Sequence, residues 1–343
     1  MSHTGLEGEG PRPLGGADKR ARDYLLERGF LPVGPATYPL FRDFMGPAVL
    51  SELTPAVSTF WTLSFNELYR VIDGCLVTVF FFEGMEPYFE LKLPMDFCPG
   101  AAGSMAPEER LRGLVETLFD LALGAALPAL RLYAVEERFL GYFTGLRGFT
   151  VQAEYSEDHS EYVYKPADIV NLSGKLNHKK HTHLNKFLDS GGITLVPLNN
   201  NNRRLFLDVE REWCASQDCG LCSAFAGCEL RALEIMAEIY DERYFHGLLA
   251  YAGDKLSGYL VWEEREEGRA YLHFGKGTVQ NLFVYLIYLL ARDELGDAAP
   301  AGERLLNINE DMGKEGLRRF KRHLGVYEHW RKYLCAYVKD GGR

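Results

Sequence analysis

The chain has 343 residues, which is enough for two domains of ordinary size, each with its own buried core. Charged residues make up 25% of it and hydrophobic residues 47%, as in globular proteins, and the formal net charge is −10. This acidic balance argues against general adhesion to DNA or to anionic membranes, so any such contact needs a local basic patch. The longest apolar run, Leu282–Ala291, is about half of the roughly 20 residues that a membrane span requires.

The beginning of the chain lacks the apolar core of a signal peptide, and its Gly/Pro-rich residues 1–17 are expected to form a disordered tail. A cytoplasmic location is therefore expected, and the seven cysteines then read as reduced thiols. Four of them have the spacing C-x4-C-x2-C-x5-C, which could close a structural zinc site. No second CxxC or histidine pair supports a metal, so small buried thiols are the preferred reading of Cys214, Cys219, Cys222 and Cys228.

The second half of the chain alternates strand and helix patterns in the order β-α-α-β-β-β-α-β-α-β. Short polar turns separate three successive strands, and the helix after them is apolar nearly all round, which indicates burial. The predicted strands are Gly192–Leu198, His246–Ala252, Lys255–Trp262, Arg269–Phe274, Leu305–Asn309 and Tyr333–Val338, and the predicted helices are Arg211–Ser216, Glu229–Tyr240, Val279–Arg292 and Lys314–His323.

The first half repeats the order β-β-β-α-β-α-β, without any repeat of individual residues. Together the halves predict a mixed α/β (α+β) fold with an N-terminal domain at 18–159 and a C-terminal domain at 160–343, joined by a basic connecting helix at 166–188. The predicted strands of the first half are Glu67–Asp73, Cys75–Phe82, Tyr88–Leu93, Leu130–Val135 and Phe149–Tyr155, and the predicted helices are Pro107–Leu123 and Glu136–Thr144.

The segments YKPADIVNLSGKLNHKKHTHLNKFL, AYLHFGK and NINEDMGKEGLRRFK resemble the bacterial family named for the C-terminal domain of phosphatidylglycerol lysyltransferase. The tail GLRRFKRHLGVYEHWRKYL is similar to the end of those lysyltransferases through Arg319-Phe320-Lys321, Trp330 and Tyr333. The element order also matches the GNAT acyltransferase fold. The resemblance, over about residues 41–337, implies two tandem GNAT-like domains related in fold to the Fem aminoacyltransferases. It also implies transfer of an activated acyl or aminoacyl group.

Basic residues are concentrated in two short segments of this acidic chain. Residues 165–186 contain five lysines and one acid, and residues 314–332 contain seven Lys/Arg and two acids. A solvated helix face usually mixes its signs, so this segregation favours an anionic ligand. The predicted pocket has Lys179 and Lys180 on one wall and Arg318, Arg319 and Lys321 on the other.

Helical phase singles out Lys180, which falls among apolar residues of the predicted connecting helix, whereas Lys179 lies with other lysines on a second side. A lysine that points inward needs a partner or a ligand. The alternative readings are a lysine stem that carries its ammonium out to solvent, or a break at Gly174 that resets the helical phase.

The GNAT resemblance implies that donor phosphates lie at the start of the helix that follows His273-Phe274-Gly275-Lys276-Gly277. The free N–H groups of a helix N-terminus suit phosphate, and Gly277 would allow close approach of the backbone. The acyl-CoA signature of that fold, [RQ]-x-x-G-x-[GA], is absent here. The family motif resembles His-Phe-Glu-Lys, and Gly275 replaces its glutamate.

Polar residues after the predicted strand Leu305–Asn309 are candidates for the missing carboxylate. Glu310 or Asp311 would act as the base for an attacking amine or hydroxyl, and Asn309 as a hydrogen-bonding group. The alternative is that one acid only caps the next helix. His273 is likewise either a base or a packed strand histidine.

The leading hypothesis is an enzyme that transfers an acyl or aminoacyl group to a small-molecule or lipid acceptor, without a tightly bound cofactor. Aminoacyl-tRNA is favoured over acyl-CoA as the donor, because the acyl-CoA signature is missing and two basic segments suit the phosphates of an RNA acceptor end. The alternatives are a CoA-dependent N-acyltransferase and a catalytically inactive GNAT pair that binds a nucleotide or RNA. The replacement at Gly275 supports the inactive alternative.

Overall fold

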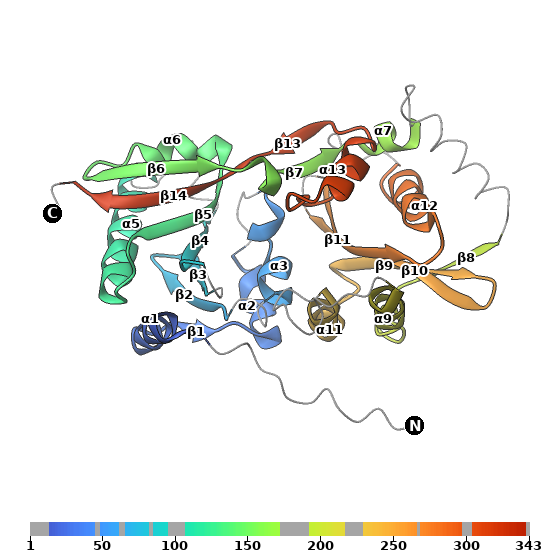
Figure 1. The fold of residues 1–343 in the computed structure, drawn as a ribbon, viewed down its shortest axis with the longest axis horizontal. Coiled ribbons are helices and arrows are strands. Elements are labelled where there is room, and N and C mark those ends of the chain that lie inside the picture. Colours follow the sequence, from blue (N-terminus) through green and yellow to red (C-terminus); the bar gives the residue numbers. More distant parts are fainter. Residues whose placement is uncertain are drawn as a thin grey trace. The chain divides into compact units, whose positions relative to one another are not determined.

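The computed structural model describes residues 14–44, 49–61, 66–81, 85–94, 107–171, 192–216, 229–265, 268–296 and 304–340 (Figure 1). These residues form two compact units, each with a mixed sheet of seven strands. The first unit contains the described residues up to Ser156, residues 229–232 and the residues from Lys332 onward. The second unit contains the remainder. The predicted fold, two tandem GNAT-like units of α/β type, is confirmed by the order of elements in both.

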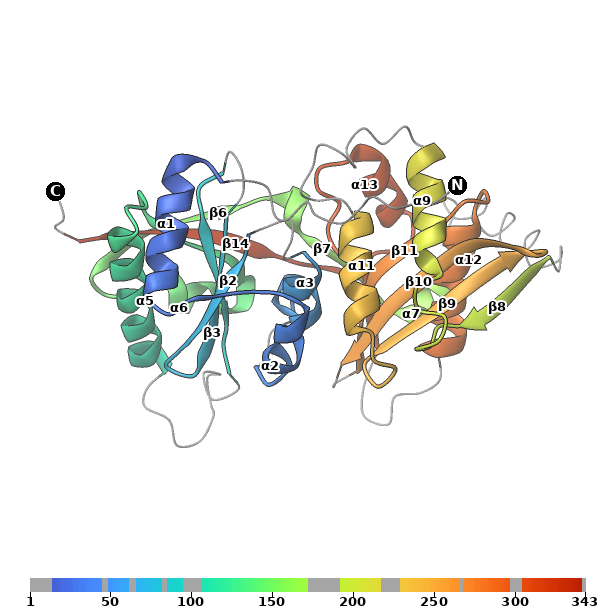
Figure 2. The ribbon, with the colours of Figure 1, turned by 90° about the horizontal axis from the view of Figure 1, so that it is seen from below.

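The first sheet has the strand order β1-β2-β3-β4-β5-β14-β6. Helices α1 and α5 pack on one face of it, and α2 and α3 lie on the other side (Figure 2). The elements of this unit are α1 (Gly16–Glu27), β1 (Leu31–Pro32), α2 (Tyr38–Arg42), α3 (Pro55–Phe60), β2 (Leu68–Ile72), β3 (Cys75–Phe80), β4 (Tyr88–Lys92), α5 (Pro107–Gly124), β5 (Leu130–Glu136), α6 (Leu140–Thr144), β6 (Phe149–Tyr155) and β14 (Lys332–Lys339).

Helix α5 illustrates how the pattern of apolar residues places the core of the first unit. Leu111, Leu114, Val115 and Leu118 recur at helical spacing and are all buried, so one stripe of α5 faces the sheet. Burial of each of these side chains contributes about 1.5–3 kcal/mol to folding. The helix therefore needs its place on the sheet, and the sheet needs α5 as a cover.

The second sheet has the order β13-β7-β12-β11-β10-β9-β8. Helix α12 packs on one face and α9 lies on the other (Figures 1 and 2). The elements are β7 (Glu161–Tyr164), α7 (Pro166–Asn171), β8 (Ile193–Pro197), α9 (Phe206–Ser216), α11 (Glu229–Ile239), β9 (Phe245–Ala252), β10 (Lys255–Arg265), β11 (Arg269–Gly277), α12 (Leu282–Leu289), β12 (Leu305–Asn307), α13 (Glu315–Arg322) and β13 (Glu328–Trp330).

The division of the chain into two units differs from the predicted division into 18–159 and 160–343. Strand β7 pairs antiparallel with β12 and β13, as expected for a second unit that begins at Glu157. The last strand, β14, returns to the first sheet and pairs antiparallel with β5 and β6. The difference arises because pairing between strands nearly 200 residues apart leaves no mark in the local sequence pattern.

Most predicted strands and helices are present within five residues of their expected ends. The elements before Leu68 and the strands β7 and β13 were not predicted. Of the predicted connecting helix at 166–188, α7 accounts for residues 166–171, and the rest lies outside the described residues. Residues 1–13 of the predicted tail at 1–17 also lie outside the described residues, and α1 begins at Gly16. No helix among the described residues is long and apolar enough to cross a membrane.

Replacing Tyr337 of β14 with Ala is expected to lower the free energy of unfolding by about 3–5 kcal/mol, because a large core side chain is removed. Tyr337 is fully buried in the first core, and its hydroxyl donates a hydrogen bond to the carbonyl of Phe143 at 3.1 Å. Tyr155→Ala on the neighbouring strand is the control, because that side chain is 44% exposed. Urea denaturation measures both, and equal effects would contradict a structural role for β14.

Candidate functional site

The second unit contains a fork between two parallel strands. Strands β11 and β12 are paired from Arg269↔Leu305 to Tyr271↔Asn307, where β12 ends while β11 continues to Gly277. We use "the fork" for residues 272–277 of β11 together with residues 308–311 after β12. The predicted catalytic residues His273, Asn309, Glu310 and Asp311 and the donor-loop residues Lys276 and Gly277 all belong to these two segments, which a hydrogen bond from Asn309 to Leu272 joins.

Asn309 lies at the apex of the fork and bridges its two sides. Its side-chain Nδ2 donates to the carbonyl of Leu272 at 3.0 Å, a position that a backbone N–H takes in a continuing parallel ladder. Its own backbone N–H donates instead to Oδ1 of Asn307 at 2.7 Å. The residue has a φ of 52°, in the left-handed region, so these contacts hold a strained backbone. Its Oδ1 is buried and accepts no hydrogen bond from the described residues.

Lys321 fastens the loop that carries this asparagine. The buried ammonium donates to three successive backbone carbonyls, those of Ile308 at 2.5 Å, Asn309 at 3.0 Å and Glu310 at 2.6 Å. Burial lowers the pKa of Lys321 to about 8, so the amine still carries three N–H donors at neutral pH. The prediction that Lys321 faces an anionic ligand is therefore not supported, because all three donors serve the protein itself.

Asp311 is a structural acceptor, which argues against its predicted role as a base. Its carboxylate accepts from Tyr162 at 2.5 Å, from the Gly313 backbone at 2.8 Å and from two nitrogens of Arg318 at 2.8 and 2.9 Å. Burial acts to raise its pKa, but the hydrogen bonds from Arg318 and Tyr162 outweigh this and lower it to about 2. Arg318 also pairs with Asp158, so it is equally unsuited to the predicted anion wall.

Glu310 is the accessible acid of the fork. Its Oε2 lies 3.1 Å from Nδ1 of His159, and the two side chains are 20% and 46% exposed. The hydrogen bond to Glu310 raises the pKa of His159 above its ordinary value, against the effect of partial burial. His159 was not among the predicted residues, because it is 151 positions away in the chain. The only local signal was a histidine among acids just before a buried strand.

His273 fits the alternative reading of a packed strand histidine. Its Nε2 lies 3.1 Å from Oε2 of Glu263, and the two side chains are only 1% and 5% exposed. The pairing of β10 with β11 shifts register between Val261 and Trp262, opposite His273. Because His273 as a whole is half-buried while its side chain is not exposed, its accessible atoms belong to the backbone.

The glycines of the fork make room for α12. A Cβ atom at Gly277 would lie 2.9 Å from the backbone nitrogen of Phe283, and one at Gly275 would lie 2.6 Å from that phenylalanine's ring. A glutamate at position 275 therefore has no space in this packing. Lys276 between them points to the other face of the sheet, where its ammonium lies 4.5 Å from the ring centre of Trp213 on α9.

The remaining predicted residues are dispersed. Arg319 is 67% exposed and pairs with Glu315 one turn away. Lys179 and Lys180 lie outside the described residues, as do Cys219, Cys222 and Cys228. The thiol of Cys214 lies 3.7 Å from Oε1 of Glu210. Within the described part of the chain, no group of three or more His, Cys, Asp or Glu side chains is arranged to hold a metal ion.

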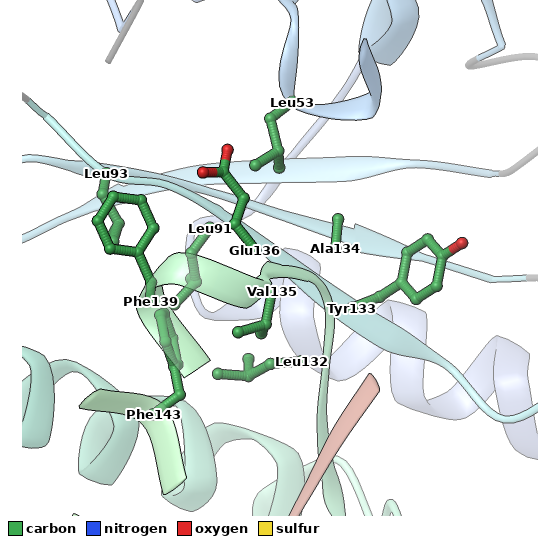
Figure 3. A pocket seen from close by; sticks show the side chains of 10 residues that line it. All are labelled: Leu53, Leu91, Leu93, Leu132, Tyr133, Ala134, Val135, Glu136, Phe139 and Phe143. Atoms are coloured by element: carbon green, nitrogen blue, oxygen red, sulfur yellow. The ribbon is translucent and has the colours of Figure 1, made fainter. Parts of the chain in front are cut away.

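A separate hollow lies in the first unit, between β4 and β5 (Figure 3). It is a small hollow, partly open to solvent, and its lining is mostly apolar, with Leu53, Leu91 and Phe139 among the walls. The carboxylate on its wall, Glu136, accepts hydrogen bonds from the Val49 backbone at 2.6 Å and from Arg138 at 2.5 Å. This acid is therefore engaged by other groups of its own unit.

A family model described as "Phosphatidylglycerol lysyltransferase, C-terminal" matches residues 104–336. Among solved structures, a conserved protein of unknown function from Bacteroides thetaiotaomicron VPI-5482 is similar, with a TM-score of 0.74 and 19% identity over 90% of this chain and 99% of that one. L-PGS from Bacillus licheniformis is also similar, with a TM-score of 0.58 and 13% identity over 90% of this chain and 93% of that one. FemX is similar with a TM-score of 0.56 and 10% identity over 89% of this chain and 96% of that one. At these identities the likeness shows a shared fold alone. No curated protein matches the sequence.

Replacing Asp311 with Asn is expected to lower the free energy of unfolding by about 3 kcal/mol, because it leaves the Arg318 charge without its main partner. The folded-state pKa of about 2 lies below the ordinary 3.8, so the carboxylate stabilises the fold above about pH 4 and this contribution is lost as the pH falls toward 2. Urea unfolding from pH 2 to pH 7 measures how the free energy of unfolding changes with pH, and the Asp254→Asn variant, at an exposed position, is the control. A parent and a D311N variant with the same pH dependence would contradict this role.

Proposed function

This chain belongs to the phosphatidylglycerol lysyltransferase C-terminal family, and we propose that it transfers an aminoacyl group from aminoacyl-tRNA to an amine or hydroxyl of a lipid or small-molecule acceptor. The reaction is proposed to take place at the fork of the second unit. The observation that carries the proposal is the side chain of Asn309, whose Oδ1 is a buried acceptor without a donor among the described residues.

The orientation of the Asn309 amide follows from its contacts. Its nitrogen faces the carbonyl oxygen of Leu272, and the flipped amide would place two acceptor oxygens against each other. An unsatisfied buried acceptor costs about 1–3 kcal/mol, so a ligand that brings an N–H donor to Oδ1 gains that amount back. The ammonium of an aminoacyl group is such a donor, whereas a plain acyl group has none. The fork therefore favours an aminoacyl donor.

Glu310 is proposed as the general base, with His159 as the residue that orients it at 3.1 Å. The acceptor amine or hydroxyl attacks the carbonyl carbon of the aminoacyl ester, and its proton passes to Glu310. The ester bond to the ribose then breaks, and the same proton goes to the leaving ribose oxygen. A new amide or ester bond is formed, the base returns to its starting state, and no oxidant or metal is consumed.

Contacts to donor phosphates are proposed for Lys276 and for residues at the start of α12, with Arg319, Lys179 and Lys180 as further candidates. Lys276 comes shortly before α12 in the chain, but its ammonium lies against Trp213 of α9 on the other face of the sheet, so it would have to leave that ring to contact a phosphate at the start of α12. A helix start attracts phosphate through its free N–H groups. Arg318 and Lys321, by contrast, are fully used in holding the site together.

A CoA-dependent N-acyltransferase is the second candidate, and the exposed backbone of His273 at the register shift of β11 favours it. Such a backbone would suit any acyl carbonyl, with or without an amino group. The absent acyl-CoA signature and the unpaired Oδ1 of Asn309 argue against it. An inactive protein is the third candidate, since Gly275 has no room for the glutamate of the family motif.

Aminoacyl-tRNA is expected to bind the full chain at least about tenfold more tightly than the same tRNA with its amino group acetylated, because acetylation replaces the charged ammonium that pairs with Asn309 by a bulkier, uncharged amide. Binding should weaken with salt by a slope near 0.7 for each phosphate neutralised on the single-stranded end. A gel-shift titration with charged, acetylated and uncharged tRNA measures both. Salt-insensitive binding of acyl-CoA without tRNA binding would favour the second candidate.

Glu310→Gln is expected to slow single-turnover transfer by about 100-fold or more, because the amide cannot accept the acceptor's proton. It should also lower the pKa of His159, since the hydrogen bond to Glu310 raises it, and an NMR titration follows this change without any substrate. Glu315→Gln on α13 is the matched control, since its carboxylate is 73% exposed. A Glu310→Gln enzyme as fast as its parent, despite the shifted histidine, would exclude Glu310 as the base.

A further inference from the structure

A cluster of buried charged residues lies in the first unit, apart from the fork. Glu90 and Lys92 are two positions apart on β4 and so share one face of the sheet. Thr78 of β3 pairs directly with Glu90 and shares that face. Glu67 precedes Leu68, whose side chain is in the core on the opposite face. The four side chains are buried, with Glu67 2%, Thr78 0%, Glu90 3% and Lys92 1% exposed.

These side chains do not satisfy one another. Lys92 Nζ and Glu90 Oε2 are 3.8 Å apart, which is too long for a hydrogen bond but short enough for a third group to contact both. Both carboxylate oxygens of Glu67, Oε2 of Glu90, Nζ of Lys92 and Oγ1 of Thr78 have no hydrogen-bond partner among the described residues. Burial raises the pKa of Glu67 well above its usual range and that of Glu90 to about 7, and it lowers the pKa of Lys92.

Two buried charged residues of the second unit differ in this respect. Asp311 and Lys321 are also buried, and each has three or more hydrogen bonds to neighbours. Buried polar groups left unpaired cost about 1–3 kcal/mol each and more when charged, so such groups in a native fold call for a ligand, ion or water. Five unpaired atoms on one sheet face therefore indicate a site whose occupant belongs to the working state of the protein.

The chemistry of the unpaired atoms defines that occupant. Oxygen atoms of Glu67, Glu90 and Thr78 outnumber the single nitrogen of Lys92. The raised pKa of each glutamate means that too little positive charge lies nearby to offset the burial of its ionised form, and a bound cation would supply that charge. The missing partner is therefore positive and rich in N–H donors. A divalent metal ion is a poorer fit, because the described residues offer no group of three His, Cys, Asp or Glu ligands. We infer that the first unit binds a small primary ammonium compound at the site formed by Glu67, Thr78, Glu90 and Lys92.

This site is independent of the proposed transfer reaction, because none of its residues belongs to the fork. Its test uses the full chain with ethanolamine, which is a primary ammonium at neutral pH. Tetramethylammonium has the same charge without any N–H group, and potassium chloride supplies a bare cation at equal ionic strength. Calorimetric titration measures binding of each, and thermal unfolding measures the stabilisation that binding must produce.

Ethanolamine is expected to bind and to raise the melting temperature, whereas tetramethylammonium and potassium are not. Glu67→Gln should weaken ethanolamine binding by about tenfold or more, through loss of a charge-assisted hydrogen bond. Without ligand the same variant should melt higher than its parent, since it removes a buried carboxylate. Glu116→Gln on the exposed side of α5 is the control and should bind like the parent.

Two results would overturn the inference. Equal stabilisation by potassium or tetramethylammonium would show a cation site without selection for N–H donors. Absence of any ligand effect in the parent, with a Glu67→Gln variant that melts higher, would show a cluster filled by water alone. Neither result depends on transfer activity, so a failure of the transferase proposal and a failure of this inference are distinguishable.

Discussion

The geometry of the fork depends on the hydrogen bonds that the Lys321 ammonium donates to three successive carbonyls. These carbonyls belong to Ile308, Asn309 and Glu310, so one ammonium fixes the backbone of both candidate functional residues. The helix that supplies it, α13, is itself tied back through Arg318 and Asp311. Without these hydrogen bonds, the left-handed backbone at Asn309 would relax, and its side chain would no longer bridge β11 and β12.

The same arrangement explains why two of the four basic residues of α13 serve the fold. Arg318 and Lys321 point at acceptors of their own unit, whereas Arg319 remains exposed to solvent. A cation that must hold a strained loop is not free to follow a ligand. The donor loop is separate, and its cation Lys276 is held from outside by the ring of Trp213. In the proposed site, the segment that holds the loop and the segment that would bind the donor are thus different parts of the chain.

The two units differ in how their buried charged side chains are hydrogen-bonded. In the second unit, buried ionisable groups such as Asp311 and Lys321 form closed networks that rigidify the fork. In the first unit, Glu67, Glu90 and Lys92 have buried atoms that no hydrogen bond from the described residues satisfies. Both patterns occur within sheets of the same element order, so the GNAT-like framework does not dictate them. They arise from the side chains that each sheet carries, because proteins of one fold differ in function through the side chains of their sites.

Local pattern in the sequence was enough to place most strands and helices and the order β-β-β-α-β-α-β in both halves. It also placed the polar residues 309–311 at the end of a strand, because strand ends and polar clusters are local features. The partners of those residues were decided by the tertiary structure alone. His159 meets Glu310 across 151 positions, and β14 enters the first sheet from the far end of the chain. Such contacts depend on how distant strands pair, which hydrophobic periodicity does not encode.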